Sequence, residues 1–350
     1  MLTRKTGRLI PATLIAVAIM GSLIEPQRFW TVAAQDDAYE EAMQTGKNLF
    51  RRGEYEDALK YFKRANEMRG KKSAERFGWM SETYLVLQAY KNVVEAAEKT
   101  IEFAAGDTTL IVKAYNNKGL ALQASAEKKD QKKLQAAEGV FRQGLAMEGA
   151  TPILRYNLGV VLLQLKRDEE GIAEMKRYIE LAPRGAYVAM ARLMAENPRR
   201  ARENYAPDFS FTSSEGEHIA LEDLRGKVVL LDFWGTWCPP CVESVPELRN
   251  LHKRYSKEPS FMLIGISSDS DEEKWREFTA KNKMIWPQYR DRDRRIQRAF
   301  GVNSFPTYVL IDHEGIVRLQ SVGMTWTRAA SLDEAIKKHV KVVAKSVEAR

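Results

Sequence analysis

The stretch KVVLLDFWGTWCPPC, residues 227–241, determines the fold of the C-terminal part of this chain. Its first half is an apolar run of the length of a buried strand, interrupted only by Asp232. The segment VESVPELRNLHKRY, residues 242–255, continues as a helix. Cys238 is therefore expected at a helix N-terminus, where free N–H groups and the helix dipole favour a thiolate.

The same stretch contains both cysteines of the 350-residue chain, Cys238 and Cys241. A structural zinc site needs four ligands. The chain has no second cysteine pair, and its histidines are scattered singly: His218, His252, His313 and His339. A structural disulfide closing a loop of about four residues would contribute roughly 2 kcal/mol, against ~4.7 kcal/mol for a 100-residue loop. The pattern favours a redox-active dithiol, with no metal and no other cofactor.

The residues around the dithiol support this chemistry. Pro239 and Pro240 have no N–H, so the amide of Cys241 is the expected donor to the Cys238 sulfur. Thiolate attack, a mixed disulfide and release by the second thiol follow from that geometry. Burial of Asp232 would raise its pKa and let it accept the proton of Cys241. In the alternative interpretation, strand alternation turns Asp232 outward.

The segments after the linker PRRARENYAP, residues 198–207, indicate an α/β domain over residues 206–350. Apolar segments alternate with helical patterns there, which predicts a central mixed sheet flanked by helices. The expected strands lie at 209–211, 227–234, 261–268 and 307–312. The expected helices lie at 241–255, 272–283, 292–300 and 328–345.

Residues 37–184 show helical periodicity throughout, with small and aromatic residues at the positions of about four tetratricopeptide repeats. The first spans 46–65, the second 74–107 and the fourth 157–183; the third carries Gly119, Phe141 and an insertion at 126–133. A capping helix at 186–197 and the linker complete the segment 185–205. We expect an all-α solenoid whose concave surface docks a protein partner. A spacer or a dimerisation element is the alternative.

The first 34 residues have the layout of a secretory signal peptide. Arg4, Lys5 and Arg8 precede an apolar run at 9–24, and small residues allow cleavage after Ala34. An uncleaved membrane anchor is the alternative. Either form predicts an exported protein, most simply in a bacterial periplasm.

The chain has a net charge of +8, but its basic residues are interleaved with acidic ones, as in YRDRDRR at 289–295. No nucleic-acid partner is therefore expected.

Taken together, LLDFWGTWCPPC (230–241) and VNSFPTYVLID (302–312) resemble the thioredoxin superfamily. The lead-in at 206–234 and the extra stretch at 269–291 narrow the resemblance to exported TlpA/ResA-like thiol–disulfide oxidoreductases of the AhpC/TSA–redoxin type. It covers roughly residues 206–345. The resemblance implies a thioredoxin-like α/β domain that exchanges disulfides with protein substrates.

The resemblance also implies roles for single residues. Cys238 would be the exposed nucleophile and Cys241 the buried resolving thiol, with Asp232 as the buried acid. Five further residues would lie beside the disulfide. Pro306 would be the cis-proline there, and four residues would contact substrate: Trp234, Trp237, Phe305 and Thr307.

The same resemblance favours a protein that reduces the disulfides of its substrates. It also implies a membrane or periplasmic donor that supplies the electrons. Members devoted to haem maturation often carry a glutamate three residues after the second cysteine, where this chain has Ser244. A peroxidase would need a threonine and a proline three and seven residues before the reactive cysteine, where Gly235 and Leu231 stand. A repeat scaffold with an accessory redox domain is the alternative function.

Overall fold

The computed structural model describes residues 26–68, 72–126, 130–323 and 326–348. The chain divides between Arg192 and Leu193 into two compact units, which are described separately. Residues 1–25, which hold most of the predicted signal segment, lie outside the described residues, and the predicted cleavage point after Ala34 falls within the first helix. None of the described helices combines the length and apolar character that crossing a membrane requires.

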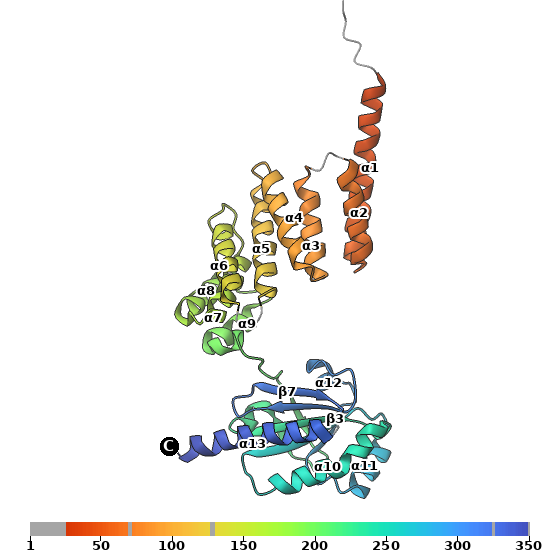
Figure 1. Cartoon of the computed structure of the whole chain (residues 1–350), viewed down its shortest axis with the longest axis vertical. Helices are drawn as coiled ribbons and strands as arrows, with labels where there is room; N and C mark the ends of the chain where they lie inside the picture. The colour runs from red at the N-terminus through yellow and green to blue at the C-terminus, as the bar shows by residue number, and fades with distance from the viewer. Residues whose placement is uncertain (1–25, 69–71, 127–129, 324–325, 349–350) are drawn as a thin grey trace, which may run out of the picture. The chain divides into compact units, whose positions relative to one another are not determined.

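The first unit consists of stacked helical pairs (Figure 1). Helices α1 and α2, α3 and α4, α5 and α6, and α7 and α8 pack as pairs, and α1 also contacts α3, α3 contacts α5 and α5 contacts α7. With α9, this makes nine helices before the linker among the described residues, so the predicted all-α region is confirmed. Their bounds are α1 (Pro26–Arg51), α2 (Tyr55–Met68), α3 (Ala74–Val86), α4 (Tyr90–Phe103), α5 (Thr108–Ala124), α6 (Gln131–Leu145), α7 (Pro152–Gln164), α8 (Asp168–Leu181) and α9 (Val188–Glu196).

Glycines set the close spacing within these helical pairs. A Cβ atom placed on Gly119 of α5 would lie 2.4 Å from the Phe141 ring of α6. In the last pair, a Cβ on Gly159 of α7 would lie 3.2 Å from the carbonyl oxygen of Gly171 on α8. The two helices therefore pack backbone to backbone, and the small residues that marked the repeats in the sequence are sites of helix contact.

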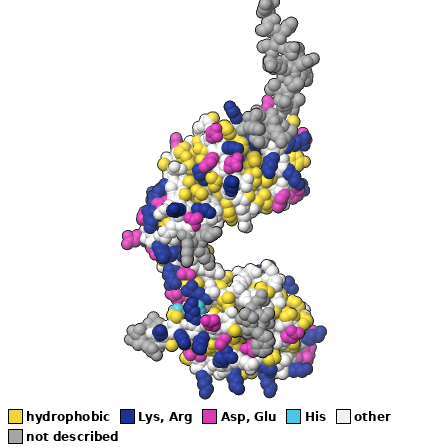
Figure 2. All heavy atoms as spheres, viewed as in Figure 1, with side chains coloured by type: hydrophobic (Ala, Val, Ile, Leu, Met, Phe, Trp, Pro, Cys, Tyr) yellow, Lys and Arg dark blue, Asp and Glu magenta, His cyan; other side chains and the backbone are white. Residues whose placement is uncertain are grey.

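Charges of both signs are mixed on the visible surface of the helical unit (Figure 2). Ion pairs link helices of the stack, among them Lys113–Glu82, Lys118–Glu98 and Arg155–Glu174. Each pair is at least partly exposed, so each contributes little to the free energy of unfolding.

The second unit is built around a five-stranded mixed sheet of order β5-β4-β3-β6-β7. The β3, β4 and β5 strands are parallel, whereas β6 is antiparallel to both β3 and β7. The predicted central mixed sheet is thus confirmed. The strands are β3 (Val228–Trp234), β4 (Phe261–Ser267), β5 (Gln288–Arg290), β6 (Thr307–Ile311) and β7 (Val317–Val322), and a separate hairpin is formed by β1 (Ser210–Thr212) and β2 (His218–Ala220).

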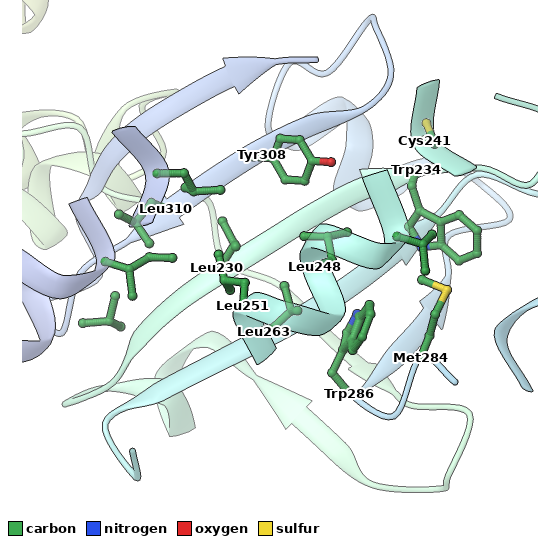
Figure 3. Close-up of a cluster of buried hydrophobic side chains, with 14 of the residues drawn as sticks. Leu230, Trp234, Cys241, Leu248, Leu251, Leu263, Met284, Trp286, Tyr308 and Leu310 are labelled. Carbon is green, nitrogen blue, oxygen red and sulfur yellow. The ribbon is translucent and has the colours of Figure 1, made fainter. Parts of the chain in front are cut away.

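Helices and the hairpin cover the two faces of the sheet. Helices α10 (Pro239–Tyr255), α11 (Glu272–Lys281) and α13 (Trp326–Glu348) cover one face, and their core is drawn in Figure 3. The short helix α12 (Arg295–Ala299) and the β1–β2 hairpin cover the other face. Alternate β3 residues divide between these faces: Leu230 and Trp234 lie under α10, and Leu231 lies on the opposite side.

The structure adds elements that the sequence pattern did not predict. Strand β5 has three residues, too few to show a period, and β7 alternates between half-buried and exposed residues. The predicted helix at 292–300 is shortened to α12, because Arg294 adopts a left-handed backbone conformation just before it. The strand β3 and the helix α10 on either side of the dithiol follow the prediction.

Candidate active site

Cys238 and Cys241 form a disulfide at the N-terminus of α10. Cys238 is the N-cap residue of this helix, and Pro239 and Pro240 occupy its first turn. The amide N–H of Cys241 donates to the Cys238 Sγ over 3.3 Å, as the missing N–H groups of the two prolines predicted. The helix therefore directs its first available N–H at the sulfur of the N-cap cysteine.

Asp232 lies on β3, on the sheet face covered by α10. It shares this face with Leu230 and Trp234 because side chains alternate along a strand. The carboxyl is 1% exposed, its Oδ1 has no hydrogen-bond partner among the described residues, and burial raises its pKa to about 8. The outward orientation considered from the sequence is therefore wrong, since both faces of this central strand are covered.

A hydrogen-bonded clamp fixes the loop in front of the dithiol. Asp269, after β4, accepts hydrogen bonds from the backbone N–H of Thr236 over 3.1 Å and from its Oγ1 over 2.6 Å. Ser267 at the end of β4 donates to the same carboxylate over 2.6 Å. Asp269 is 4% exposed, so these contacts replace water around its oxygens. The clamp ties the start of the cysteine loop to the neighbouring strand.

The aromatic residues near the disulfide differ in exposure. Trp237 is 56% exposed and makes an edge-to-face contact with Phe305, with ring centroids 5.3 Å apart. Trp234 is 1% exposed and packs against Phe278 in the core beneath α10 (Figure 3). The substrate contact that the resemblance implied is thus open to the side chain of Trp237 but not to that of Trp234.

The loop before β6 carries the next two site residues. The Phe305–Pro306 peptide bond is cis, and the Pro306 carbonyl accepts a hydrogen bond from the Gly323 N–H over 2.8 Å. Neither backbone polar group of Phe305 has a backbone partner within the described part of the chain. Thr307 begins β6, is 1% exposed and donates from Oγ1 to the Ser304 carbonyl over 2.6 Å. Its side chain therefore holds the loop and is not presented to solvent.

The exposure of the two sulfurs requires a correction. Cys238 was expected to be exposed and Cys241 buried, but they are 5% and 2% exposed in the disulfide form. Both cysteines belong to the hydrophobic cluster under α10, and the sulfur of Cys238 is engaged with that of Cys241. The bond and the cluster together remove Cys238 from solvent.

Ser244 of α10 and Tyr308 of β6 form a buried hydrogen-bonded pair. Ser244 donates to the Cys241 carbonyl over 2.7 Å, and the hydroxyl of Tyr308 donates to Ser244 Oγ over 3.0 Å. Tyr308 is opposite Asp232 in the β3–β6 register, and burial and the Asp232 charge raise the pKa of its phenol. The position where the resemblance led us to look for a glutamate is thus occupied by Ser244, which forms a neutral hydroxyl pair with Tyr308.

Sequence reasoning missed Asp269 and Tyr308. Asp269 carries a weak signal, since an acidic residue after a strand adjacent to β3 reaches the same sheet edge as the cysteine loop. Tyr308 has no sequence signal, because its contact with Ser244 spans 64 positions. No group of three or more His, Cys, Asp or Glu side chains that could hold a metal occurs in the part of the chain that the structure describes.

The C-terminal part of the chain is similar in sequence to known proteins. Residues 203–320 match the AhpC/TSA family. The chain is 37% identical over 118 residues to the thiol-disulfide oxidoreductase ResA of Bacillus thuringiensis (strain Al Hakam), covering 34% of this chain and 68% of the relative. It is 34% identical over 119 residues to the thioredoxin-like protein YneN of Bacillus subtilis (strain 168), covering 34% and 69%. A solved thiol-disulfide oxidoreductase from Bacteroides fragilis NCTC 9343 is 29% identical, with 38% of this chain and 99% of that chain covered and a TM-score of 0.35.

Proposed function

Since the chain belongs to the ResA-type thiol-disulfide oxidoreductases, we propose that its C-terminal domain reduces disulfides of exported proteins through Cys238 and Cys241. The observation that carries the proposal is the position of the dithiol, at a helix N-terminus and on the same sheet face as a buried carboxyl with a raised pKa. This arrangement supplies a stabilised thiolate and a proton acceptor within one hydrophobic cluster.

The reaction begins with the reduced dithiol. The Cys238 thiolate attacks one sulfur of the substrate disulfide; a mixed disulfide forms and the other substrate sulfur leaves as a thiolate, which takes up a proton. In the molecules whose Asp232 is ionised, a fraction that grows as the pH approaches its pKa of about 8, the thiol of Cys241 then loses its proton to this carboxylate and attacks Cys238 Sγ. The mixed disulfide breaks, the second substrate thiolate leaves, and the Cys238–Cys241 disulfide remains. Two electrons have passed to the substrate, and an electron donor returns the dithiol.

The surface beside the disulfide supports binding of an extended protein segment. Trp237 offers an exposed aromatic face, and the unpaired backbone groups of Phe305 can pair with one residue of a substrate strand. The edge-to-face contact of Phe305 with Trp237 holds this loop next to the cysteine loop, and Thr307 anchors it from inside. Main-chain pairing would accept many sequences, as a general reductant requires.

We further propose that the helical unit is a tetratricopeptide-repeat array that docks a protein partner. Its helices form stacked pairs, and glycine–aromatic contacts such as Gly119–Phe141 recur in it. We also propose export to the periplasm, with residues 1–34 as a signal peptide that is cleaved; a membrane or periplasmic protein would then supply electrons. Residues 35–200, added as a competitor, should reduce complex formation if the array docks the substrate protein.

Trapping tests the proposed function directly. The Cys241→Ser variant should accumulate mixed disulfides through Cys238, because the resolving thiol is absent. The Cys238→Ser variant should accumulate far fewer, since it lacks the attacking thiol. Equilibration of the wild-type dithiol with dithiothreitol should give a low reduction potential, in the range of thioredoxin at roughly −270 mV. No mixed disulfide on Cys238, or a pair that dithiothreitol cannot cycle, would refute the oxidoreductase function.

A further inference from the structure

A hollow with a volume of about 950 Å³ lies in the second unit, away from the dithiol. The C-terminal half of α10, the helix α11 and the segment that leads into β5 form its walls. Arg249, the lining residue of α10 nearest to Cys238 in sequence, is eleven positions further along this helix, which corresponds to roughly 16 Å. The hollow therefore does not belong to the disulfide site, and the proposed function does not use it.

The charges around the hollow are mostly positive. Four cations, Arg249, Lys253, Arg276 and Lys283, face one carboxylate, Glu215. Arg276 is engaged in an ion pair, whereas the two lysines have no ion pair with any residue that the structure describes. Unpaired cations around a concavity attract anions, and the attraction is strongest where the walls exclude water.

The floor of the hollow contains a buried amide without a partner. Gln288, at the start of β5, lines the hollow and is 1% exposed. Its Oε1 and Nε2 have no hydrogen-bond partner among the described residues, and the amide lies over Gly265 of β4. A buried donor and acceptor left unpaired are costly and call for an explanation. The amide faces Gly265, and a turn of the Gln288 side chain away from this glycine would present both atoms to a ligand in the hollow.

Apolar side chains complete the lining. Ile285 is 78% exposed at the rim, although large aliphatic residues are usually buried. Met284 and Trp286 lie at the edge of the buried cluster in Figure 3, and both also line the hollow. Ile285, Met284 and Trp286 therefore give the hollow an apolar side.

We propose that this hollow binds a small organic anion with a flat apolar body. The acidic group lies between Lys253, Lys283 and Arg249. The ring system packs against Ile285 and Trp286, and a polar group on it pairs with the amide of Gln288.

The volume and the strand edge both favour a small molecule over a peptide. Small-ligand sites measure roughly 300–1,000 Å³. A peptide that adds a strand to β5 meets an occupied edge, because the carbonyl of Gln288 already accepts the N–H of Ser214 over 2.9 Å.

A fluorescent anion tests the proposal on the oxidised full chain. Titration with 8-anilinonaphthalene-1-sulfonate should show a saturable site with quenching of tryptophan emission. The double variant Lys253→Gln, Lys283→Gln should bind roughly tenfold more weakly, because two charge-assisted contacts are lost. The matched control Lys227→Gln, Lys337→Gln removes the same charge from outside the hollow and should bind as the wild type does. The uncharged dye N-phenyl-1-naphthylamine should not distinguish the variants.

Gln288→Met tests the floor, since it keeps the length of the side chain and removes both polar atoms. It should weaken dye binding and leave dithiol cycling unchanged; if it unfolds, the lysine variants decide. The proposal is overturned if the Lys253/Lys283 variant binds the dye as the control does. It is also overturned if a short acidic peptide displaces the dye while 2-naphthoate does not. Neither result would bear on the disulfide chemistry.

Discussion

Burial keeps the Asp232 carboxyl neutral up to a pKa of about 8, whereas the ordinary value is 3.8. The folded chain therefore holds a proton between these values that the unfolded chain has released. Stability falls over that interval as the pH rises, by roughly 1.4 kcal/mol per pH unit for one group. The residue that accepts the proton of Cys241 in the proposed reaction thus weakens the fold at neutral pH.

Replacing Asp232 with asparagine removes this cost. The amide has nearly the same shape and no charge, so Asp232→Asn should unfold at higher denaturant concentration than the wild type. The difference should be small near pH 4, grow as the pH rises towards 8, and level off above it, because the folded wild type ionises there. Urea unfolding of the oxidised proteins at a series of pH values, followed by tryptophan fluorescence, measures it.

The same variant separates stability from chemistry. Asp232→Asn should resolve mixed disulfides more slowly although its fold is more stable, because Cys241 has lost its proton acceptor. An exposed control, Asp223→Asn, should change neither property. A stability difference between Asp232→Asn and the wild type that does not vary with pH would show that the folded carboxyl is already ionised.

At single residues, the sequence predicted what depends on near neighbours in the chain. The donor to Cys238 followed from Pro239 and Pro240, and the burial of Asp232 followed from the apolar run around it. Trp234 was misjudged because its two-residue offset from Asp232 places it on the inner face of the same strand. Asp269 was missed because its partner Thr236 is 33 positions away, beyond the reach of any local pattern.

At the scale of elements, the helices of the first unit contain glycines of two kinds, which differ in their contacts with the neighbouring helix. Gly119 lies in the α5–α6 contact, where a Cβ would be 2.4 Å from the Phe141 ring. Gly139 lies inside α6, exposed, and an added Cβ would meet no atom within 4 Å. Only the first is required by packing, although both are glycines in helices of the same pair.

Alanine at each position should therefore have opposite effects. Gly119→Ala should destabilise the helical unit by roughly 1–3 kcal/mol, the usual cost of overpacking a well-packed contact. Gly139→Ala should stabilise it by roughly 0.5–1 kcal/mol, because alanine is the better helix former. Thermal unfolding followed by far-ultraviolet circular dichroism compares the two. Equal effects of the same sign would contradict the packing role assigned to Gly119.

The elements themselves were predictable where they were long and periodic. The sequence shows helical periodicity over α10 and an apolar run over β3. Because the strand precedes the helix, the dithiol between them was predicted to lie at the helix N-terminus. Strand β5 was not predictable, since three residues carry no period and its pairing with Gly265 of β4 is formed only in the folded sheet. The hollow at Gln288 was hidden for the same reason.

For the whole molecule, each of the two units has its own hydrophobic cores. The helical unit buries clusters around Phe62 and around Phe141, whereas the redox unit buries one cluster on each side of its sheet. The sequence predicted a change of architecture at residues 185–205, and the compact units divide at Arg192. Separate cores predict separate cooperative transitions.

Calorimetry of the full chain should therefore show two transitions, of which only one responds to redox state. The disulfide and Asp232 both belong to the second unit, so its transition should move to lower temperature when dithiothreitol reduces the oxidised protein. A disulfide of low potential stabilises the fold that contains it, and a loop of about four residues is worth roughly 2 kcal/mol. That corresponds to a shift of roughly 4–8 °C for a unit of this size. Five of the seven tryptophans, Trp234, Trp237, Trp275, Trp286 and Trp326, lie in this unit, so fluorescence melting assigns its transition.

The helical transition should stay in place under the same changes, because its unit contains neither cysteine. Gly119→Ala provides the reciprocal control, since it should move the helical transition and leave the fluorescence transition unchanged. A single transition that moves as a whole in both experiments would mean that the two units unfold together. An upward shift on reduction would mean that the disulfide destabilises its domain, which is the property of an oxidant and would reverse the proposed direction of electron flow.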